Sequence, residues 1–264
     1  MSCVERSKDS ERVLQQIAGA QKGQPILETI DQLKQDLILA SAILEWDIGD
    51  IWGHVSARLP DDSGFLLKHL RHQVKDINRP EEVMTFDYDG NLLSGSKGVP
   101  KEIVIYTTLY RTRPEINGIV HAHPPMAITV TATNQKIVPI HLHSFVFKDA
   151  VPVYPIPIMI CTDEEGKAID KKMGSHSTII IKGHGAVTVG SDHKDATIQM
   201  LYLERTARMI AAAKHGTIKP IPPKYIKIQE QRLARNAASS DHHFRLEWEY
   251  FTRKLKKNEP WTRG

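Results

Sequence analysis

Two short apolar runs that end in histidine constrain this chain more than any other feature. One, GIVHAH, runs into a pair of prolines, and the other, TIIIKGHG, breaks at a glycine turn. Apolar runs of this length between turn residues are typical of buried strands. Segments with helical spacing surround them without a fixed repeat period, so the sequence predicts a three-layer α/β/α protein.

Apolar spacing, prolines and glycines predict the remaining elements. We expect helices over 25–45, 100–113, 124–133, 163–174, from Ser191 or Asp192 to Gly216, and in the final 248–257. Extended segments are expected over 51–60, 64–70, 83–93 with a turn at 88–91, 136–147 and 151–160. The proline-rich stretch 218–228 is not expected to form a regular helix.

The positive charge of the chain is concentrated at its C-terminal end. The whole sequence has 35 Lys and Arg against 31 Asp and Glu, and residues 215–264 hold 11 and 5 of these. Acidic residues interleave with the basic ones there, and no nucleic-acid recognition motif accompanies them. A solvated helix face therefore explains the arm better, and neither nucleic acid nor a membrane is expected as a partner.

The N-terminus and the cysteines point to the cytoplasm. Residues 1–16 alternate charged and apolar types without the apolar core of a signal peptide, and no stretch is long enough to span a membrane. Cys3 and Cys161 are the two cysteines, and they form neither a disulfide framework nor a cysteine metal site. We expect a cytoplasmic protein.

The two histidine-bearing strands could meet at one metal site. His121 and His123 lie two residues apart, so in a strand both imidazoles project from the same face. His184 lies between Gly183 and Gly185, where the backbone can approach a neighbour closely. Three imidazoles around a divalent ion leave positions open for water or substrate, as catalytic sites do. Histidine ligands suit Zn, Mn, Fe, Co or Ni, and we expect one Zn or Mn per subunit.

These histidines also have possible explanations that involve no metal. An isolated H-x-H pair more often faces solvent, and a second pair, His141 and His143, has the same spacing in an extended apolar context. That second pair lacks a glycine-flanked partner, so it ranks behind the first, although His141 remains a candidate to line the pocket. A structural role is the default for the other histidines.

The stretch SKGVPKEIVIYTTLYRTRPEINGIVHAHPP, followed by IIIKGHGAVTVG, resembles the class II aldolase/adducin family, whose fold is that of fuculose-phosphate aldolase. The resemblance covers about residues 30–213. It implies that His121, His123 and His184 hold a catalytic metal. It also implies that Glu102 acts as acid/base or fourth metal contact. Without the resemblance, Glu102 would be an acidic residue favoured by the dipole at a helix start.

One segment departs from the aldolase pattern. Where sugar-phosphate aldolases carry G-N-x-S-x-R, this chain has Gly53-His54-Val55-Ser56-Ala57-Arg58. With histidine in place of asparagine, this segment more closely resembles another branch of the family. That branch decarboxylates hydroxylated aromatic or heteroaromatic carboxylates through a metal-stabilised carbanion. A metal-dependent carbon–carbon lyase of this kind is the expected function. A sugar-phosphate aldolase and a non-catalytic, adducin-like interaction module are the alternatives.

Several residues are candidates to contact the small-molecule substrate. Arg58 and Lys97 could bind a carboxylate, and Ser56 could donate a hydrogen bond beside Arg58. His54 is a candidate substrate contact or proton donor. The alternative is that Arg58 is an exposed strand residue and Lys97 a solvated loop charge, and for Lys97 this alternative has about the same weight.

Three regions are expected along the chain. Residues 1–22 form a lead-in, 23–215 the catalytic domain, and 216–264 an arm that packs on the body or on a neighbouring subunit. The family resemblance implies a homotetramer with active sites between subunits. Tyr225, Trp248 or Tyr250 of one subunit's arm could then close the neighbour's site.

Overall fold

A computed structural model describes residues 29–69, 82–95, 98–213, 216–235 and 237–256. In chain order the elements are α2 (Ile30–Ile48), β1 (His54–Arg58), β2 (Phe65–His69), β3 (Met84–Phe86), β4 (Leu92–Ser94), α3 (Ile103–Thr112), β5 (Gly118–Ala122), α4 (Pro125–Ala132), the 3-10 helix η2 (Leu142–Phe147), β6 (Val153–Tyr154), α5 (Asp163–Met173), β7 (Thr178–Ile181), β8 (Gly185–Gly190), α6 (His193–Ala212), α7 (Pro223–Arg235) and α8 (Ala237–Lys256). Most of the predicted elements are therefore confirmed.

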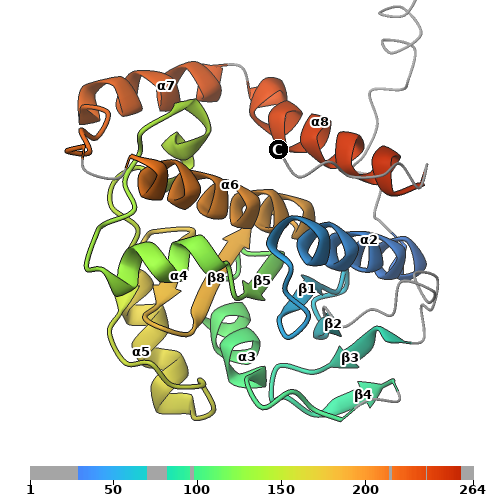
Figure 1. Cartoon of the computed structure of the whole chain (residues 1–264). Coiled ribbons are helices and arrows are strands. Elements are labelled where there is room, and N and C mark those ends of the chain that lie inside the picture. The colour runs from blue at the N-terminus through green and yellow to red at the C-terminus, as the bar shows by residue number, and fades with distance from the viewer. Residues whose placement is uncertain (1–28, 70–81, 96–97, 214–215, 236, 257–264) are drawn as a thin grey trace, which may run out of the picture.

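An eight-stranded sheet forms the middle layer, in the order β4-β3-β2-β1-β5-β8-β7-β6. All neighbouring strands are antiparallel except β6 and β7. Helices α2, α4 and α6 cover one face of the sheet and α3 and α5 the other (Figure 1). The predicted three-layer α/β/α architecture is confirmed.

Two apolar cores follow from the alternation of side chains along the strands. Leu66 of β2 packs with α2 and α6, whereas its neighbours Phe65 and Leu67 pack under α3 and α5. Strands buried on both faces are expected to be apolar at nearly every position. Strand β5, GIVHA, is buried throughout, so its one ionisable residue, His121, lies inside the protein.

Two predicted elements are wrong. Residues 142–147 form a 3-10 helix instead of an extended segment, because the Ser144 hydroxyl accepts from the backbone N–H groups of Ile140 and His141 and turns the chain. Residues 223–228 are helical as the start of α7. Pro223 is the first helical residue, where a missing N–H costs nothing, and no proline follows it in the helix.

The C-terminal helix α8 packs across α2 and α6 (Figure 1). Its Trp248 and Phe251 are buried in the same apolar core as α2 and α6. Trp248 is only 6% exposed, so its own subunit already covers it and it is not the aromatic that closes a neighbour's site. Tyr225 and Tyr250 are exposed. Among the described helices, none is both long and apolar enough to cross a membrane.

Candidate metal centre

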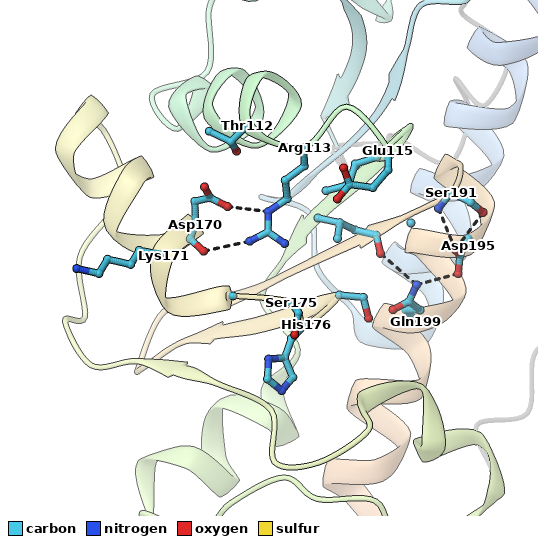
Figure 2. Close-up of a pocket in the computed structure, with 15 residues that line it drawn as sticks. Thr112, Arg113, Glu115, Asp170, Lys171, Ser175, His176, Ser191, Asp195 and Gln199 are labelled. Carbon is cyan, nitrogen blue, oxygen red and sulfur yellow. Dashed lines mark hydrogen bonds and ion pairs between the residues drawn. The ribbon is translucent and has the colours of Figure 1, made fainter. Parts of the chain in front are cut away.

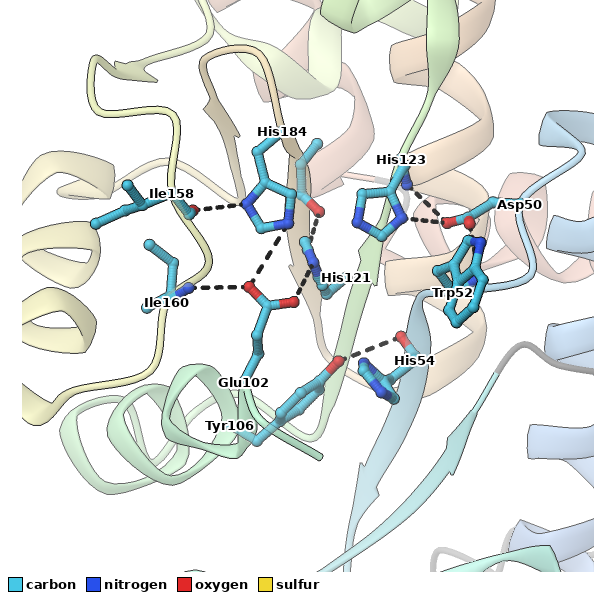
Figure 3. Close-up of polar contacts among 11 residues, drawn as sticks. Asp50, Trp52, His54, Glu102, Tyr106, His121, His123, Ile158, Ile160 and His184 are labelled. Carbon is cyan, nitrogen blue, oxygen red and sulfur yellow. Dashed lines mark hydrogen bonds and ion pairs between the residues drawn. The ribbon is translucent and has the colours of Figure 1, made fainter. Parts of the chain in front are cut away.

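Strands β5 and β8 bring the three predicted histidines together. Their antiparallel pairing sets Ala122 opposite Ala186, so that the end of β5 meets the start of β8. His121 is the fourth residue of β5, His123 follows that strand directly, and His184 directly precedes β8. One nitrogen from each ring lies within 4.8 Å of the other two (Figure 3).

Gly185 makes this close approach possible. A Cβ at this position would lie 2.6 Å from the carbonyl oxygen of Ala122 and 3.1 Å from ring atoms of both His121 and His123. Any side chain here would push the two ligand strands apart. The expectation that a glycine beside His184 allows close backbone approach is therefore correct for Gly185.

A hydrogen bond orients each imidazole through its Nδ1. The Nδ1 of His121 donates to the carbonyl of Ala186 at 3.0 Å, and that of His184 donates to the carbonyl of Ile158 at 2.9 Å. The Nδ1 of His123 lies 2.9 Å from a carboxylate oxygen of Asp50. Since carbonyls and carboxylates only accept, the proton of each neutral ring lies on Nδ1, which leaves the Nε2 lone pair free for an ion.

Glu102 lies at the start of α3 and faces the same nitrogens. Its Oε2 is 3.2 Å from His121 Nε2, its Oε1 is 3.6 Å from His184 Nε2, and Oε1 also accepts from the Ile160 N–H. Burial alone would raise the pKa of Glu102, but positive charge shared with His121, the Ile160 N–H and positive charge at His184 lower it to about 2. Glu102 is therefore a carboxylate.

The ligand set fits a divalent cation. His121 Nε2 is fully buried and has no hydrogen-bond partner among the described residues. A carboxylate oxygen at 3.2 Å and an imidazole lone pair repel each other unless a proton or a cation joins them. His121, His123 and His184 are thus the residues that would hold the ion, with Glu102 beside them.

Asp50 completes the centre and was not predicted. It follows Gly49, which ends α2 in a left-handed conformation, and its Oδ2 accepts from both the backbone N–H and Nδ1 of His123. Burial raises the pKa of Asp50, but the bonds from His123 and the N–H of Trp52 bring it down to about 2. Its only sequence signal is a Gly-Asp pair after a helix, which does not indicate a distant histidine.

Replacing Asp50 by asparagine is expected to weaken metal binding about 10–100-fold, because the partners that orient metal-bound histidines have effects of this size. Competition with a chromophoric chelator measures the change. Asp47→Asn, three residues earlier in the last turn of α2, is the matched control because the Asp47 carboxylate pairs with Arg208 instead of a histidine. Equal affinity in Asp50→Asn and the wild type would contradict the orienting role.

His54 lies beside the centre on the neighbouring strand. The register of β1 and β5 pairs it with His121, and the two rings are 6.5 Å apart. The His54 Nδ1 is buried without a hydrogen-bond partner among the described residues. The ring of His69, for which only a structural role was expected, lies 4.5 Å from the His54 ring, centroid to centroid. Burial is the main reason why the pKa of His54 lies well below its ordinary value, and the nearby His69 and His121 lower it further.

Comparison with known proteins places this site in a family. Residues 42–211 match the family model described as the class II aldolase and adducin N-terminal domain. The chain belongs to this family. The resemblance seen in the sequence is therefore confirmed.

Individual members of the class II aldolase family are similar to this chain. A 3,4-dihydroxyphthalate decarboxylase of Arthrobacter keyseri is 27% identical over 187 residues, which are 65% of this chain and 75% of that protein. The corresponding decarboxylase of Rhodococcus jostii is 28% identical over 61% of this chain and 71% of its own length. The solved L-fuculose 1-phosphate aldolase shares the fold, with a TM-score of 0.66, 18% identity, and coverage of 76% of this chain and 96% of its own.

Within this class II aldolase fold, Ser56 and Arg58 do not reach the histidines. Ser56 is fully buried, and its hydroxyl pairs with the Tyr110 hydroxyl under α3. Arg58 is four residues beyond His54, about 13 Å along the strand. Its guanidinium donates to the backbone carbonyls of Tyr110, Ile116 and Arg113 and to Asp62 and Tyr88. Both side chains hold β1 to its surroundings.

The other two proposed substrate contacts lie elsewhere. His141 Nε2 pairs with the Thr206 hydroxyl on α6 instead of with a residue of the metal centre. Lys97 falls outside the described residues. A cavity of about 750 Å³ around Arg113, Asp170 and Gln199 lies at the opposite ends of β7 and β8 from His184 (Figure 2). The metal centre is thus identified by its ligands and not by cavity volume.

Proposed function

We propose that this protein is a divalent-metal-dependent carbon–carbon lyase that decarboxylates a hydroxylated aromatic or heteroaromatic carboxylate. The observation that carries the proposal is the convergence of three Nδ1-anchored imidazoles with the buried carboxylate of Glu102. An interaction module has no need for free Nε2 atoms facing a carboxylate. Similarity to two dihydroxyphthalate decarboxylases supports the substrate class.

The bound ion supplies a Lewis acid that stabilises negative charge on a substrate oxygen. His121, His123 and His184 fix its place, and Asp50 holds the His123 ring. Ionised Glu102 accepts the proton of the substrate hydroxyl. The carbon–carbon bond then breaks, carbon dioxide leaves, and the electron pair stays on the ring carbon. Glu102 returns its proton to that carbon, so it serves first as base and then as acid.

His54 is assigned to hydrogen bonding with the substrate. Its unpartnered Nδ1 lies on the strand next to His121, and its lowered pKa keeps the ring neutral, which suits a hydrogen-bonding role better than proton donation by an imidazolium. A carboxylate or hydroxyl of the substrate would satisfy the buried nitrogen. This role replaces the carboxylate contact that Arg58 does not supply.

His54→Asn is expected to lower kcat/KM about 10–100-fold while metal content stays stoichiometric, because a hydrogen bond to a charged group is worth about 1.5–3 kcal/mol. Steady-state kinetics and elemental analysis check the two parts. His176→Asn, a surface histidine paired with Asp149, is the control. Unchanged turnover of every accepted substrate would remove the role.

Subunit assembly belongs to the same proposal. We propose a homotetramer in which neighbouring subunits meet around the metal centre. Trp52, Ile158 and Met159 are exposed apolar side chains in the two segments that supply Asp50 and the carbonyl holding His184. Exposed apolar side chains in both segments beside the centre suit burial against another subunit. Light scattering on the purified protein measures the assembly, and a monomer at micromolar concentration would contradict it.

A substrate screen tests the reaction type. Hydroxy-aromatic carboxylates and sugar phosphates are supplied with Mn or Zn, and release of carbon dioxide or aldehyde is followed. Release of an aldehyde from a sugar phosphate would favour the aldolase alternative. The same histidines and the fold shared with L-fuculose 1-phosphate aldolase are compatible with that reaction. Purified protein that contains no stoichiometric divalent metal after careful preparation would contradict the enzyme proposal and favour the adducin-like module.

A further inference from the structure

Three histidines lie side by side across three adjacent strands of the sheet. The register pairs His69 of β2 with His54 of β1, and His54 with His121 of β5. All three face α3, because even spacing puts His69 on the same face as Phe65 and His121 on the same face as Ile119, two residues of the core under that helix. The ring centroids are 4.5 Å apart between His69 and His54, and 6.5 Å between His54 and His121. This histidine row therefore starts at a proposed metal ligand and extends away from it by two strands.

The histidine row becomes more accessible with distance from the metal centre. His121 is fully buried, His54 is 6% exposed, and His69 is half-buried. An imidazole carries at least one N–H whether it is neutral or protonated. The two outer rings are neighbours, so an acidic group of a bound molecule can receive hydrogen bonds from both of them.

The charges around the centre favour an acidic group at these two rings. Glu102 is a carboxylate that faces His121 and His184, on the β5–β8 side of the centre, where it repels a second anion. The one lysine of β2, Lys68, pairs with Glu82 at 3.0 Å. The one arginine of β1 is already bonded to backbone carbonyls. On β1 and β2, the histidines are thus the basic side chains that face the centre.

We propose that His69 is a further substrate-binding residue, which together with His54 binds a carboxylate that the reaction leaves on the substrate ring. The inference rests on the proposed function, because it takes a substrate oxygen to lie at the metal. Adjacent strands are about 4.8 Å apart, so an aromatic ring that extends from the metal across β1 brings its far substituent to this pair. The departing carboxylate is the poorer occupant, since holding it would stabilise the ground state more than the transition state.

Two matched catechols test the assignment by calorimetry on the metal-loaded full chain. The compounds 3,4-dihydroxybenzoate and 3,4-dihydroxybenzamide present the same two hydroxyls to a metal, and only the first has an anionic group at the far end of its ring. We expect the wild type to bind the benzoate about tenfold or more tightly than the amide, the size expected of hydrogen bonds to a charged group. His69→Phe keeps a flat ring without an N–H and should remove most of this preference. Its affinity for the amide and its metal content should stay unchanged.

Three further measurements separate substrate binding from a structural role of His69. His69→Gln retains an N–H donor and should restore part of the preference for the benzoate, which a residue that only fills space would not do. His176→Phe, at a histidine paired with Asp149, is the matched control and should keep the full preference. With an accepted substrate, His69→Phe should raise KM and leave kcat nearly unchanged, because the retained carboxylate is bound equally in the ground and transition states.

The possible outcomes decide between the substrate contact and its absence. A wild type without the preference, or a preference that survives in His69→Phe, would overturn the assignment. Circular dichroism checks folding, and His69→Leu repeats the test if His69→Phe does not fold; loss of the fold in both variants would make His69 structural and overturn the assignment as well. The proposed function can fail separately, because binding is measured without turnover. A preference that depends on His69 in a protein that decarboxylates none of the screened compounds would support the carboxylate contact and contradict the reaction.

Discussion

Replacing His184 by alanine is expected to leave the protein folded but without stoichiometric metal. Two imidazoles would remain, and the loss of metal affinity should exceed the roughly 100-fold that removal of an orienting partner produces. Activity should fall at least about 1,000-fold, since Lewis-acid stabilisation of the transition state is worth several kcal/mol. Elemental analysis, circular dichroism and turnover measure the three quantities.

His176→Ala is the matched control for this experiment. His176 is a partly exposed histidine that pairs with Asp149, away from the centre. It should retain metal and activity. A His184→Ala protein that still holds one tightly bound ion per chain would show that His184 is not a ligand, and the proposed centre would have to be abandoned.

Replacing Glu102 by glutamine is expected to separate metal binding from catalysis. The glutamine oxygen can still accept from the Ile160 N–H, so the segment should keep its conformation. Turnover should fall about 100–10,000-fold, the range typical of a lost general acid or base. Metal content should remain stoichiometric, because the three imidazoles are unchanged.

The comparison of kcat with metal content decides the role of Glu102. Glu115→Gln, an exposed carboxylate beyond the end of α3, controls for the loss of one charge. If Glu102→Gln loses metal and activity together, Glu102 is a ligand and does not carry the proton. If turnover is unchanged, it does neither.

The three histidines of the candidate metal centre could be brought together from the sequence because their signals are local. An apolar strand followed by histidine is visible within seven residues, and strands that end in histidine are buried on both faces here, as the apolar runs suggested. Glu102 needed more than a local signal. Its position at the start of a helix has an ordinary electrostatic explanation, and only the family resemblance connected it with the histidines.

The contacts around the ligands could not be predicted, because they depend on tertiary packing. Asp50 follows a helix in a different part of the chain, and nothing within its own segment indicates His123 as a partner. For Arg58, by contrast, the sequence suggested a contact that the structure does not form. A guanidinium suits a carboxylate, but its place near the far end of β1 lets backbone carbonyls occupy it instead.

The ligands arrive from two neighbouring strands at the centre of the sheet, and this has a thermodynamic consequence. An ion that binds the folded chain but not the unfolded one adds about 4 kcal/mol to the free energy of unfolding when its free concentration is about 1,000 times Kd. Because β5 and β8 would share the ion, that energy would act on the pairing of the two strands. Amide hydrogens at the centre of the sheet would then exchange more slowly as metal is supplied. The ion proposed for catalysis would therefore also control how often these two strands open.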